Sequence, residues 1–306
     1  MTRKIIYLIN PISGTRGKSN LRDLVIRKTT TEDIDFEIID TNAEGDYGFL
    51  KSRIRKERVT DVVICGGDGT VNAVASALIG EDVRTGIIPM GSGNGLAFTA
   101  KIPKQPTAAL EIIFRGKASA IDGFYINGQF SCMLCGIGFD ARVAHEFAKQ
   151  KKRGLQTYIK VSLLNYLNAL PYPFEIISGD RSFNTRAYFI SIANSNQFGN
   201  NVTIAPQASL RDGLLDIVIV KKMSKFSLPF SLLGQVIGIN AMQDIRDVTE
   251  KKNIIYFQTP ALTIFNKELA PLHIDGDPKE TADRFDISVI PRAMRLLQPP
   301  EAAFMD

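Results

Sequence analysis

The sequence predicts two domains, an α/β domain followed by a mainly β domain. Short apolar runs alternate with helical segments over the first third of the chain, this pattern changes near Ile121-Asp122-Gly123, and strand-like segments dominate after residue 170. A chain of 306 residues is also long enough for two domains of ordinary size. We therefore expect domains at residues 1–125 and 126–306, with the last residues able to pack back on the first domain.

The first domain is expected to be doubly wound. Its predicted strands are rich in Ile and Val and are bounded by Gly, Pro or charged residues, which is typical of parallel strands buried on both faces. The segments between them have helical spacing. In chain order we predict strand 5–9, helix 21–28, strand 36–40, helix 49–57, strand 62–65, helix 71–78 and strand 85–89.

The second domain is expected to be an antiparallel β-sandwich that follows a helical region, Ala141–Leu170. Phe174–Ile177 and Thr185–Ala193 read as a hairpin joined by the turn Ser178-Gly179-Asp180. Further alternating segments predict strands at 215–220, 254–258, 262–266, 271–274 and 285–290.

The bulk composition favours a cytoplasmic protein with an anionic partner. The net charge of +5 suits a nucleotide, a nucleic acid or an acidic lipid surface, whereas the basic runs at 53–58 and 149–153 fit solvated helix faces better than a binding patch. We expect no nucleic-acid partner. The three cysteines read as core residues of a reducing compartment. The apolar stretch Phe226–Met242 is interrupted by Pro and Gly and is too short to span a bilayer, so membrane contact should be peripheral.

The strongest chemical signal is the loop Gly66-Gly67-Asp68-Gly69-Thr70-Val71-Asn72, between a predicted strand and a predicted helix. Adjacent glycines let a backbone approach phosphate closely, and a helix N-terminus offers unpaired N–H groups. The alternative is a tight turn in which Asp68 and Thr70 cap the helix. An Asp between glycines favours a Mg-nucleotide site, with predicted contacts at Gly66, Gly67, Asp68, Gly69, Thr70 and Asn72.

Two more loops follow predicted strands of the same sheet. Asn10–Gly14 follows the first strand, and Pro89–Gly95 follows the strand that ends at Pro89. Because loops at the carboxyl ends of parallel strands lie together, all three are expected to converge on one ligand, with a smaller contribution from Thr41. The predicted contacts are Asn10, Pro11, Ser13, Gly14, Thr41, Gly91, Ser92, Gly93 and Asn94.

These motifs, NPISG, GGDGTVN and PMGSGN in that order, resemble the nucleotide-binding elements of the diacylglycerol kinase catalytic-domain superfamily, which includes bacterial lipid kinases, sphingosine kinases and ceramide kinases. The resemblance covers nearly the whole chain. It implies a first domain similar to those of phosphofructokinase and NAD kinase, and ATP- and Mg²⁺-dependent transfer of the γ-phosphate to a hydroxyl of a diacylglycerol-like or sphingoid lipid at the membrane surface. A homodimer is also expected.

The resemblance also implies roles for residues of the second domain. The segment around Asp212 is similar to the family's structural magnesium site, in which Asp212 would supply a carboxylate and Ser209 and Leu214 main-chain carbonyls. His273-Ile274-Asp275-Gly276-Asp277 looks like the family's late DGE-type element, whose final acid accepts the proton of the lipid hydroxyl. Asp277 holds that position with a shorter side chain than Glu, so Asp275 stays an alternative.

Several alternatives remain open. Asp140 either caps a helix or faces the lipid head group, and His145 and His273 read as structural or incidental. Lipid tails would enter an apolar pocket roofed by 155–170 or 226–242, although ordinary core helices fit those segments equally well. Gly95 stands where many bacterial relatives carry Asp, which leaves the lipid unidentified. An NAD kinase-like or other small-molecule kinase and a non-catalytic nucleotide or lipid sensor are the competing functions.

Overall fold

A computed structural model of the chain describes residues 3–10, 18–42, 45–150, 161, 164–165, 169–197, 204–223, 242–243 and 252–300. The chain divides into two compact units, one comprising Met1–Asp122 with Pro291–Asp306 and the other Gly123–Ile290. The segments expected to roof a lipid pocket, 155–170 and 226–242, lie mostly outside the described residues. Among the helices of the described ranges, none has both the length and the apolar character to cross a bilayer.

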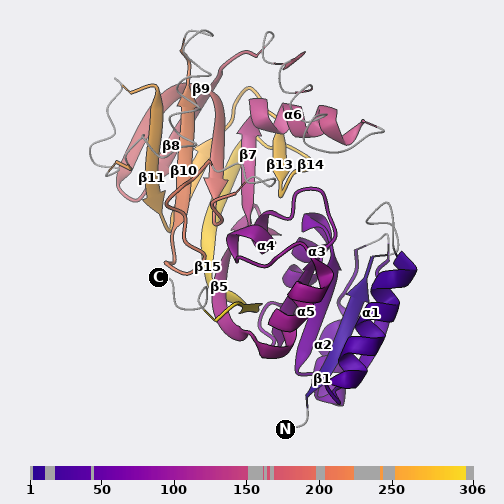
Figure 1. Ribbon diagram of the computed structural model, residues 1–306. Helices are drawn as coiled ribbons and strands as arrows, with labels where there is room; N and C mark the ends of the chain where they lie inside the picture. Colours follow the sequence, from indigo (N-terminus) through magenta and orange to yellow (C-terminus); the bar gives the residue numbers. More distant parts are fainter. Residues whose placement is uncertain are drawn as a thin grey trace. The chain divides into compact units, whose positions relative to one another are not determined.

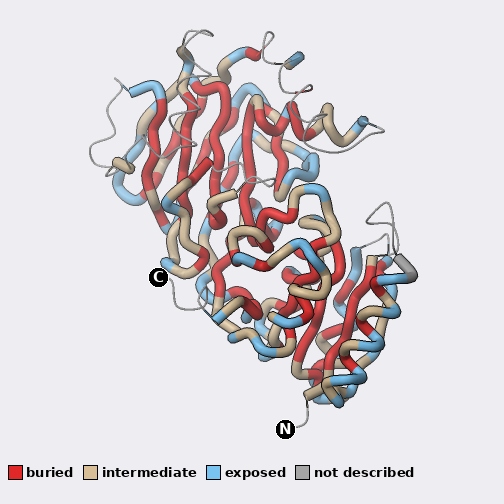
Figure 2. The backbone as a smooth tube through the Cα atoms, in the orientation of Figure 1, coloured by how far each residue is buried: buried red, intermediate tan, exposed pale blue. Residues whose placement is uncertain are grey.

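The first unit contains a parallel sheet with strand order β2-β1-β3-β4 (Figure 1). The last part of β15 extends this sheet, because Arg295 and Leu296 pair in parallel with β4. Apolar β-branched residues fill the two central strands, which are buried along nearly their whole length (Figure 2). The strand bounds are β1 (Lys4–Ile9), β2 (Asp35–Asp40), β3 (Asp61–Gly66), β4 (Arg84–Pro89) and β15 (Arg284–Gln298).

Helices lie between or after these strands in the described part of the first unit, and their bounds are α1 (Lys18–Thr31), α2 (Phe49–Glu57), α3 (Asp68–Leu78), α4 (Gly95–Thr99) and α5 (Pro106–Arg115). α1 packs beside α5, and α2 packs beside α3 (Figure 1). Right-handed crossovers that run in opposite directions from the centre of a sheet place their helices on opposite faces. The predicted doubly wound α/β fold is therefore confirmed, although α5 was not predicted.

The second unit is built from antiparallel strands. Its sheet runs β14-β13-β7-β9-β8-β12-β15, and β10 pairs with both β9 and β11. The predicted 174–193 hairpin is present, with Gly179 in its turn at a φ of 55°. Its remaining elements are β5 (Lys117–Ile126, beginning in the first unit), β6 (Gln129–Ser131), β7 (Leu134–Gly138), α6 (Phe139–Ala148), β8 (Tyr172–Ser178), β9 (Arg181–Ala193), β10 (Leu215–Lys221), β11 (Ile254–Thr259), β12 (Ala261–Phe265), β13 (Leu272–Ile274) and β14 (Asp277–Lys279).

One apolar cluster forms the core of this second unit. Alternate residues of its strands point into the cluster, among them Ile137, Ile192, Ile217 and Phe257, none of which is more than marginally exposed. Such alternation is typical of a sandwich, in which the inner faces of the strands form the core, although β7 and β10 are buried on both faces. The predicted β-sandwich is therefore confirmed, while β5, β6, β7 and β14 were not predicted as strands.

Candidate functional site

The three glycine-containing loops emerge from adjacent strands of the first unit. Asn10 follows β1, Gly67 follows β3, which ends at Gly66, and the loop before α4 follows β4. The strand order 2-1-3-4 reverses direction between β1 and β3, and α/β sheets bind ligands at the carboxyl ends of the strands at such a point. The side-chain amide of Asn10 donates to the Thr70 hydroxyl at 3.1 Å and so joins the first two loops.

The second and third loops are in direct backbone contact. A Cβ added at Gly91 would lie 2.7 Å from the Gly67 Cα, closer than real Cβ atoms approach, so only glycine fits there. Asn94, at a φ of 55°, holds the third loop closed because its side chain accepts from the Gly91 N–H and donates to the Gly91 carbonyl, both at 2.8 Å. Ser92 and Gly93 lie within the loop that Asn94 closes.

Asp68 connects these two loops. Its carboxylate accepts a hydrogen bond from the main-chain N–H of Asn94 at 2.7 Å. The side chain therefore reaches beyond its own helix, whose N-cap position is Gly67 and has no side-chain capping hydrogen bond. Gly69 and Thr70 lie in the first turn of α3 and Asn72 follows it; the first N–H groups of a helix have no intrahelical acceptor, and the N-terminus favours an anion.

Of the other predicted nucleotide contacts in the first unit, the structure describes Thr41 but not Pro11, Ser13 or Gly14. Thr41 follows β2 and is nearly buried, and its hydroxyl is hydrogen-bonded to Tyr47. Burial raises the pKa of Tyr47, and the bond to Thr41 partly offsets this effect. Pro11, Ser13 and Gly14 lie outside the described residues. Thr41 thus lies at the same edge of the sheet as the glycine loops, but its hydroxyl is already engaged.

In the second unit, Asp275 and Gly276 form a two-residue turn between β13 and β14. Their φ values of 51° and 82° are the positive pair that a type I′ hairpin requires, which explains the Asp-Gly sequence. The Asp275 carboxylate accepts from the Ser131 hydroxyl at 2.7 Å and from the Leu134 N–H at 3.0 Å. Asp277, the residue that follows Gly276, is exposed. The two carboxylates therefore face different environments.

Away from this turn in the chain, the Asp212 carboxylate lies near the carboxylate of Asp216. The Gln258 side-chain amide donates to Asp212 at 3.2 Å and to Asp216 at 3.1 Å, so the two carboxylates lie close together. Burial raises the pKa of Asp216 to about 6, against hydrogen bonds from Tyr256 and Gln258. A hard cation suits two neighbouring carboxylates and exposed carbonyls, so these residues fit magnesium. Within the described ranges no three His, Cys, Asp or Glu side chains form a metal site, so main-chain carbonyls such as those of Ser209 and Leu214 would have to complete it.

An open groove of about 350 Å³ on the second unit contains none of the predicted site residues. Residues of β8, β9 and the end of β12 line it, including Phe174, Glu175, Arg186 and Lys267. Its lining has both charges and no convergent polar groups, so nothing connects it with the chemistry of the predicted residues.

Two residues that the sequence analysis left as structural or ambiguous lie next to the Asp275 turn. His273 and Asp140 are both buried, and their Nε2 and Oδ2 atoms are 3.4 Å apart. Asp140 lies in the first turn of α6 and accepts from the Ala141 N–H at 2.8 Å, while the N-cap position of this helix is Gly138 and has no side-chain capping hydrogen bond. In the sequence, His273 stands two residues before Asp275 and four before Asp277, the predicted base. This closeness in the chain was the signal that could have pointed to His273.

Comparison with known proteins agrees with this division into an α/β unit and a β unit. Residues 4–126 match the diacylglycerol kinase catalytic domain, and residues 134–298 match the YegS C-terminal NAD kinase beta sandwich-like domain. Two solved structures from Bacillus anthracis share the fold, and each covers 98% of both chains. One, titled as a diacylglycerol kinase, has a TM-score of 0.73 and 18% identity. The other has a TM-score of 0.80 and 21% identity.

Curated relatives place the chain more narrowly within this class. A protein of Pectobacterium atrosepticum named "Probable lipid kinase YegS-like" is 29% identical over the full length of both chains. The Escherichia coli protein named "Probable lipid kinase YegS" is 30% identical and aligns over 86% of both chains. The chain therefore belongs to the YegS-like lipid kinase family, within the proteins that carry a diacylglycerol kinase catalytic domain.

Proposed function

We propose that the protein transfers the γ-phosphate of ATP to a hydroxyl of a diacylglycerol-like or sphingoid lipid at a membrane surface. Its membership of the lipid kinase family supports the reaction class. The observation that carries the proposal furthest is the pair of glycine loops joined by the Asp68–Asn94 hydrogen bond at the switch point of the sheet. Two loops held in contact offer a rigid surface of backbone N–H groups, which suits a polyphosphate.

The ATP phosphates would lie on Gly66–Asn72 and on the loop closed by Asn94. Phosphoryl transfer depends chiefly on positioning and on neutralising charge, which fixed N–H groups and a helix N-terminus supply. The hydrogen bond from Asn94 uses one lone pair of the Asp68 carboxylate, and an ionised carboxylate has several more for a magnesium ion or its water. Asp68 thus both joins the loops and faces the metal in this proposal.

Asp277 would accept the proton of the lipid hydroxyl. Its exposure leaves the carboxylate accessible, whereas the Asp275 carboxylate is used by Ser131 and Leu134 to fix the turn. A base must come within hydrogen-bond reach of the proton it takes, which favours the exposed acid. We therefore assign the base to Asp277 and the positioning of the turn to Asp275.

The first test is phosphate transfer from labelled ATP with Mg²⁺ to a panel of neutral lipids in mixed micelles. We expect one lipid class to be labelled by the unmodified protein, and Asp68→Ala and Asp277→Asn to lose this labelling. Transfer to NAD or to a sugar phosphate instead would assign the chain to another branch of kinases. ATP binding without transfer to any acceptor would point to a sensor.

Replacing Gly91 with Ala is expected to weaken ATP binding by about tenfold or more, because fitting an extra methyl group into a tightly packed contact costs about 1–3 kcal/mol. The added Cβ would push against the Gly67 Cα and separate the two loops. Gly80→Ala is the control for an added methyl group and for backbone strain, since Gly80 has a positive φ of 82° but open space around the Cβ position, whereas Gly91 has no positive φ. Titration with a fluorescent ATP analogue should show normal binding for Gly80→Ala; normal binding by Gly91→Ala would contradict the role given to the loop contact.

Magnesium alone is expected to raise the thermal unfolding midpoint, since a ligand at about 100 times its dissociation constant stabilises the folded state by about 2.7 kcal/mol. Asp212, with the neighbouring Asp216, would hold the cation, which would supply positive charge to offset the two carboxylates. Asp212→Asn should remove most of the shift, whereas Asp286→Asn, at an exposed carboxylate of the same unit, should keep it. Scanning fluorimetry with Mg²⁺ or with EDTA measures this shift, and an equal shift in Asp212→Asn would place the ion elsewhere.

A further inference from the structure

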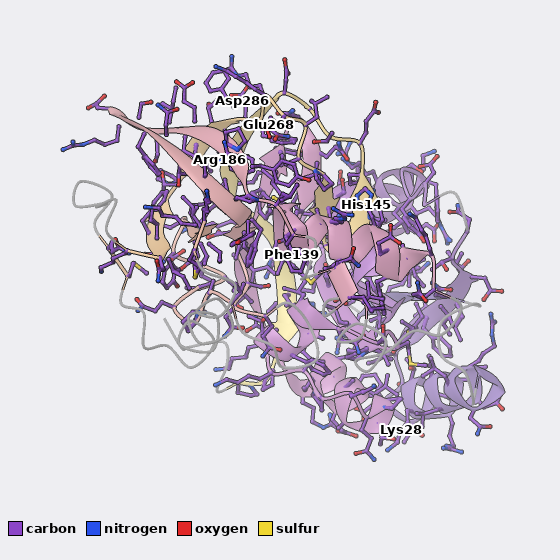
Figure 3. The ribbon with its side chains drawn as sticks, turned by 90° about the horizontal axis from the view of Figure 1, so that it is seen from above. Lys28, Phe139, His145, Arg186, Glu268 and Asp286 are labelled. Atoms are coloured by element: carbon purple, nitrogen blue, oxygen red, sulfur yellow. The ribbon has the colours of Figure 1, made fainter. Side chains whose placement is uncertain are left out.

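Both histidines of the chain are associated with the short strand β13: His273 belongs to it, and His145 is hydrogen-bonded to it. The His145 Nε2, labelled in Figure 3 on α6, is hydrogen-bonded to the Leu272 carbonyl at 2.8 Å. The next residue, His273, lies within 3.4 Å of Asp140 in the first turn of the same helix. α6 therefore contacts β13 at two successive residues, of which only His273 is also hydrogen-bonded to the Asp275-Gly276 turn.

The imidazole of His273 continues this connection into the turn. Its Nδ1 accepts a hydrogen bond from the main-chain N–H of Gly276 at 3.2 Å. Because Nδ1 is an acceptor, the ring proton must lie on Nε2, the atom that faces the Asp140 carboxylate. A continuous series of contacts thus runs from the Ala141 N–H through Asp140 and His273 to Gly276.

The pair is buried and closely packed. His273 is 2% exposed and Asp140 is 6% exposed, and the Asp140 Oδ2, which lies 3.4 Å from the His273 Nε2, makes no hydrogen bond among the described residues. A Cβ added at Gly136 would lie 1.9 Å from that oxygen and 2.5 Å from the His273 Nε2. Gly136 thus leaves room for these two side chains and for nothing else, and a buried carboxylate requires such a partner.

We propose that the Asp140–His273 pair is a positioning element that fixes the Asp275-Gly276 turn and so orients Asp277 toward the acceptor hydroxyl. This inference rests on the proposed kinase function. The turn is held on one side by Ser131 and Leu134 through Asp275, and on the other by His273 through Gly276. Loss of one side displaces the carboxylate that follows, and a displacement of about 1 Å is able to cost on the order of 100-fold in rate.

The two ring nitrogens are separable by substitution. Asn at position 273 places an amide oxygen where Nδ1 lies, so His273→Asn keeps the acceptor for Gly276 but does not reach Asp140. Gln at the same position places an amide nitrogen near Nε2, so His273→Gln keeps the contact with Asp140 and loses the acceptor. Asp140→Asn is nearly isosteric, but its amide is unable to accept from both the Ala141 N–H and the His273 Nε2–H.

Steady-state transfer kinetics on these variants test the proposal. We expect His273→Gln and Asp140→Asn to lower kcat by roughly 10- to 100-fold with the KM for ATP changed less than about twofold, and His273→Asn to recover kcat to within about threefold of the unmodified protein. His145→Ala, which removes the hydrogen bond to Leu272, is the matched control and should lower only the unfolding midpoint. Equal kcat in all variants, or a kcat that falls only as the unfolding midpoint falls, would overturn the positioning role.

A second readout does not depend on the substrate. Nitrogen NMR of the imidazole should report the Nε2–H tautomer in the unmodified protein, and the Gly276 amide should exchange with solvent faster in Asp140→Asn and in His273→Gln. If no lipid is phosphorylated, the proposed function fails, while Gly276 exchange still decides whether the pair holds the turn. An Nδ1–H tautomer, or unchanged exchange in both variants, would reject the proposal outright.

Discussion

Replacing Asp277 with Asn is expected to lower the rate of phosphate transfer to lipid by about 10²- to 10⁴-fold, the range typical of a positioned general base. The amide keeps the size of the side chain but accepts a proton far less readily. Asp277 is exposed, so the free energy of unfolding should change by less than about 0.5 kcal/mol. Initial rates at saturating ATP, together with ATP affinity measured by titration, separate the loss of proton transfer from a loss of nucleotide.

Asp275→Asn and Asp277→Glu are the matched comparisons. Asn tolerates the positive φ at position 275 and still accepts from the Ser131 hydroxyl or the Leu134 N–H, so Asp275→Asn should keep most of the transfer rate. Asp277→Glu keeps a carboxylate at the exposed position and should retain measurable transfer. A larger loss in Asp275→Asn than in Asp277→Asn would reverse the assignment of the base.

The fold was predictable where burial and local pattern agree. After their first residues, Lys4 and Asp61, β1 and β3 are almost entirely apolar because both faces are covered, and this is visible in the sequence. α5 was missed although Pro106 stands at its start, a common first helical residue. β15 continues past the predicted end at Ile290 because Arg292 takes a positive φ of 55° and its N–H donates to Asp122 at 2.8 Å. A bend that depends on a residue so distant in the chain leaves no local pattern.

The candidate site was predictable in its residue types but not in its contacts. Glycines and an Asp at strand ends indicated the loops, since these residue types have few other uses there. The bond from Asn94 to Asp68 and the packing of Gly67 on Gly91 arise only when two strands become neighbours. His273 and Asp140 belong to different elements, so neither residue by itself indicates a pair. The sequence therefore predicted which loops matter, and the structure supplies the residues that hold them in place.

The largest loss of stability is expected from Asp61→Asn, at about 3–5 kcal/mol, the cost of breaking a buried ion pair from one side. Asp61 is fully buried and accepts from Arg3 at 2.8 and 3.1 Å, from Arg84 at 2.6 Å and from the Thr60 hydroxyl at 2.6 Å. Arg3 also donates to the carbonyls of Ile113 and Phe114 at the end of α5. A neutral Asn would leave two partly buried guanidinium groups without a counter-charge and loosen the attachment of α5 to the sheet.

The pair Arg22–Asp40 provides the control, because its side chains are 43% and 60% exposed and Asp40→Asn should cost less than about 1 kcal/mol. Urea unfolding of both variants decides the point: similar losses would mean that burial adds nothing to the Asp61 interactions.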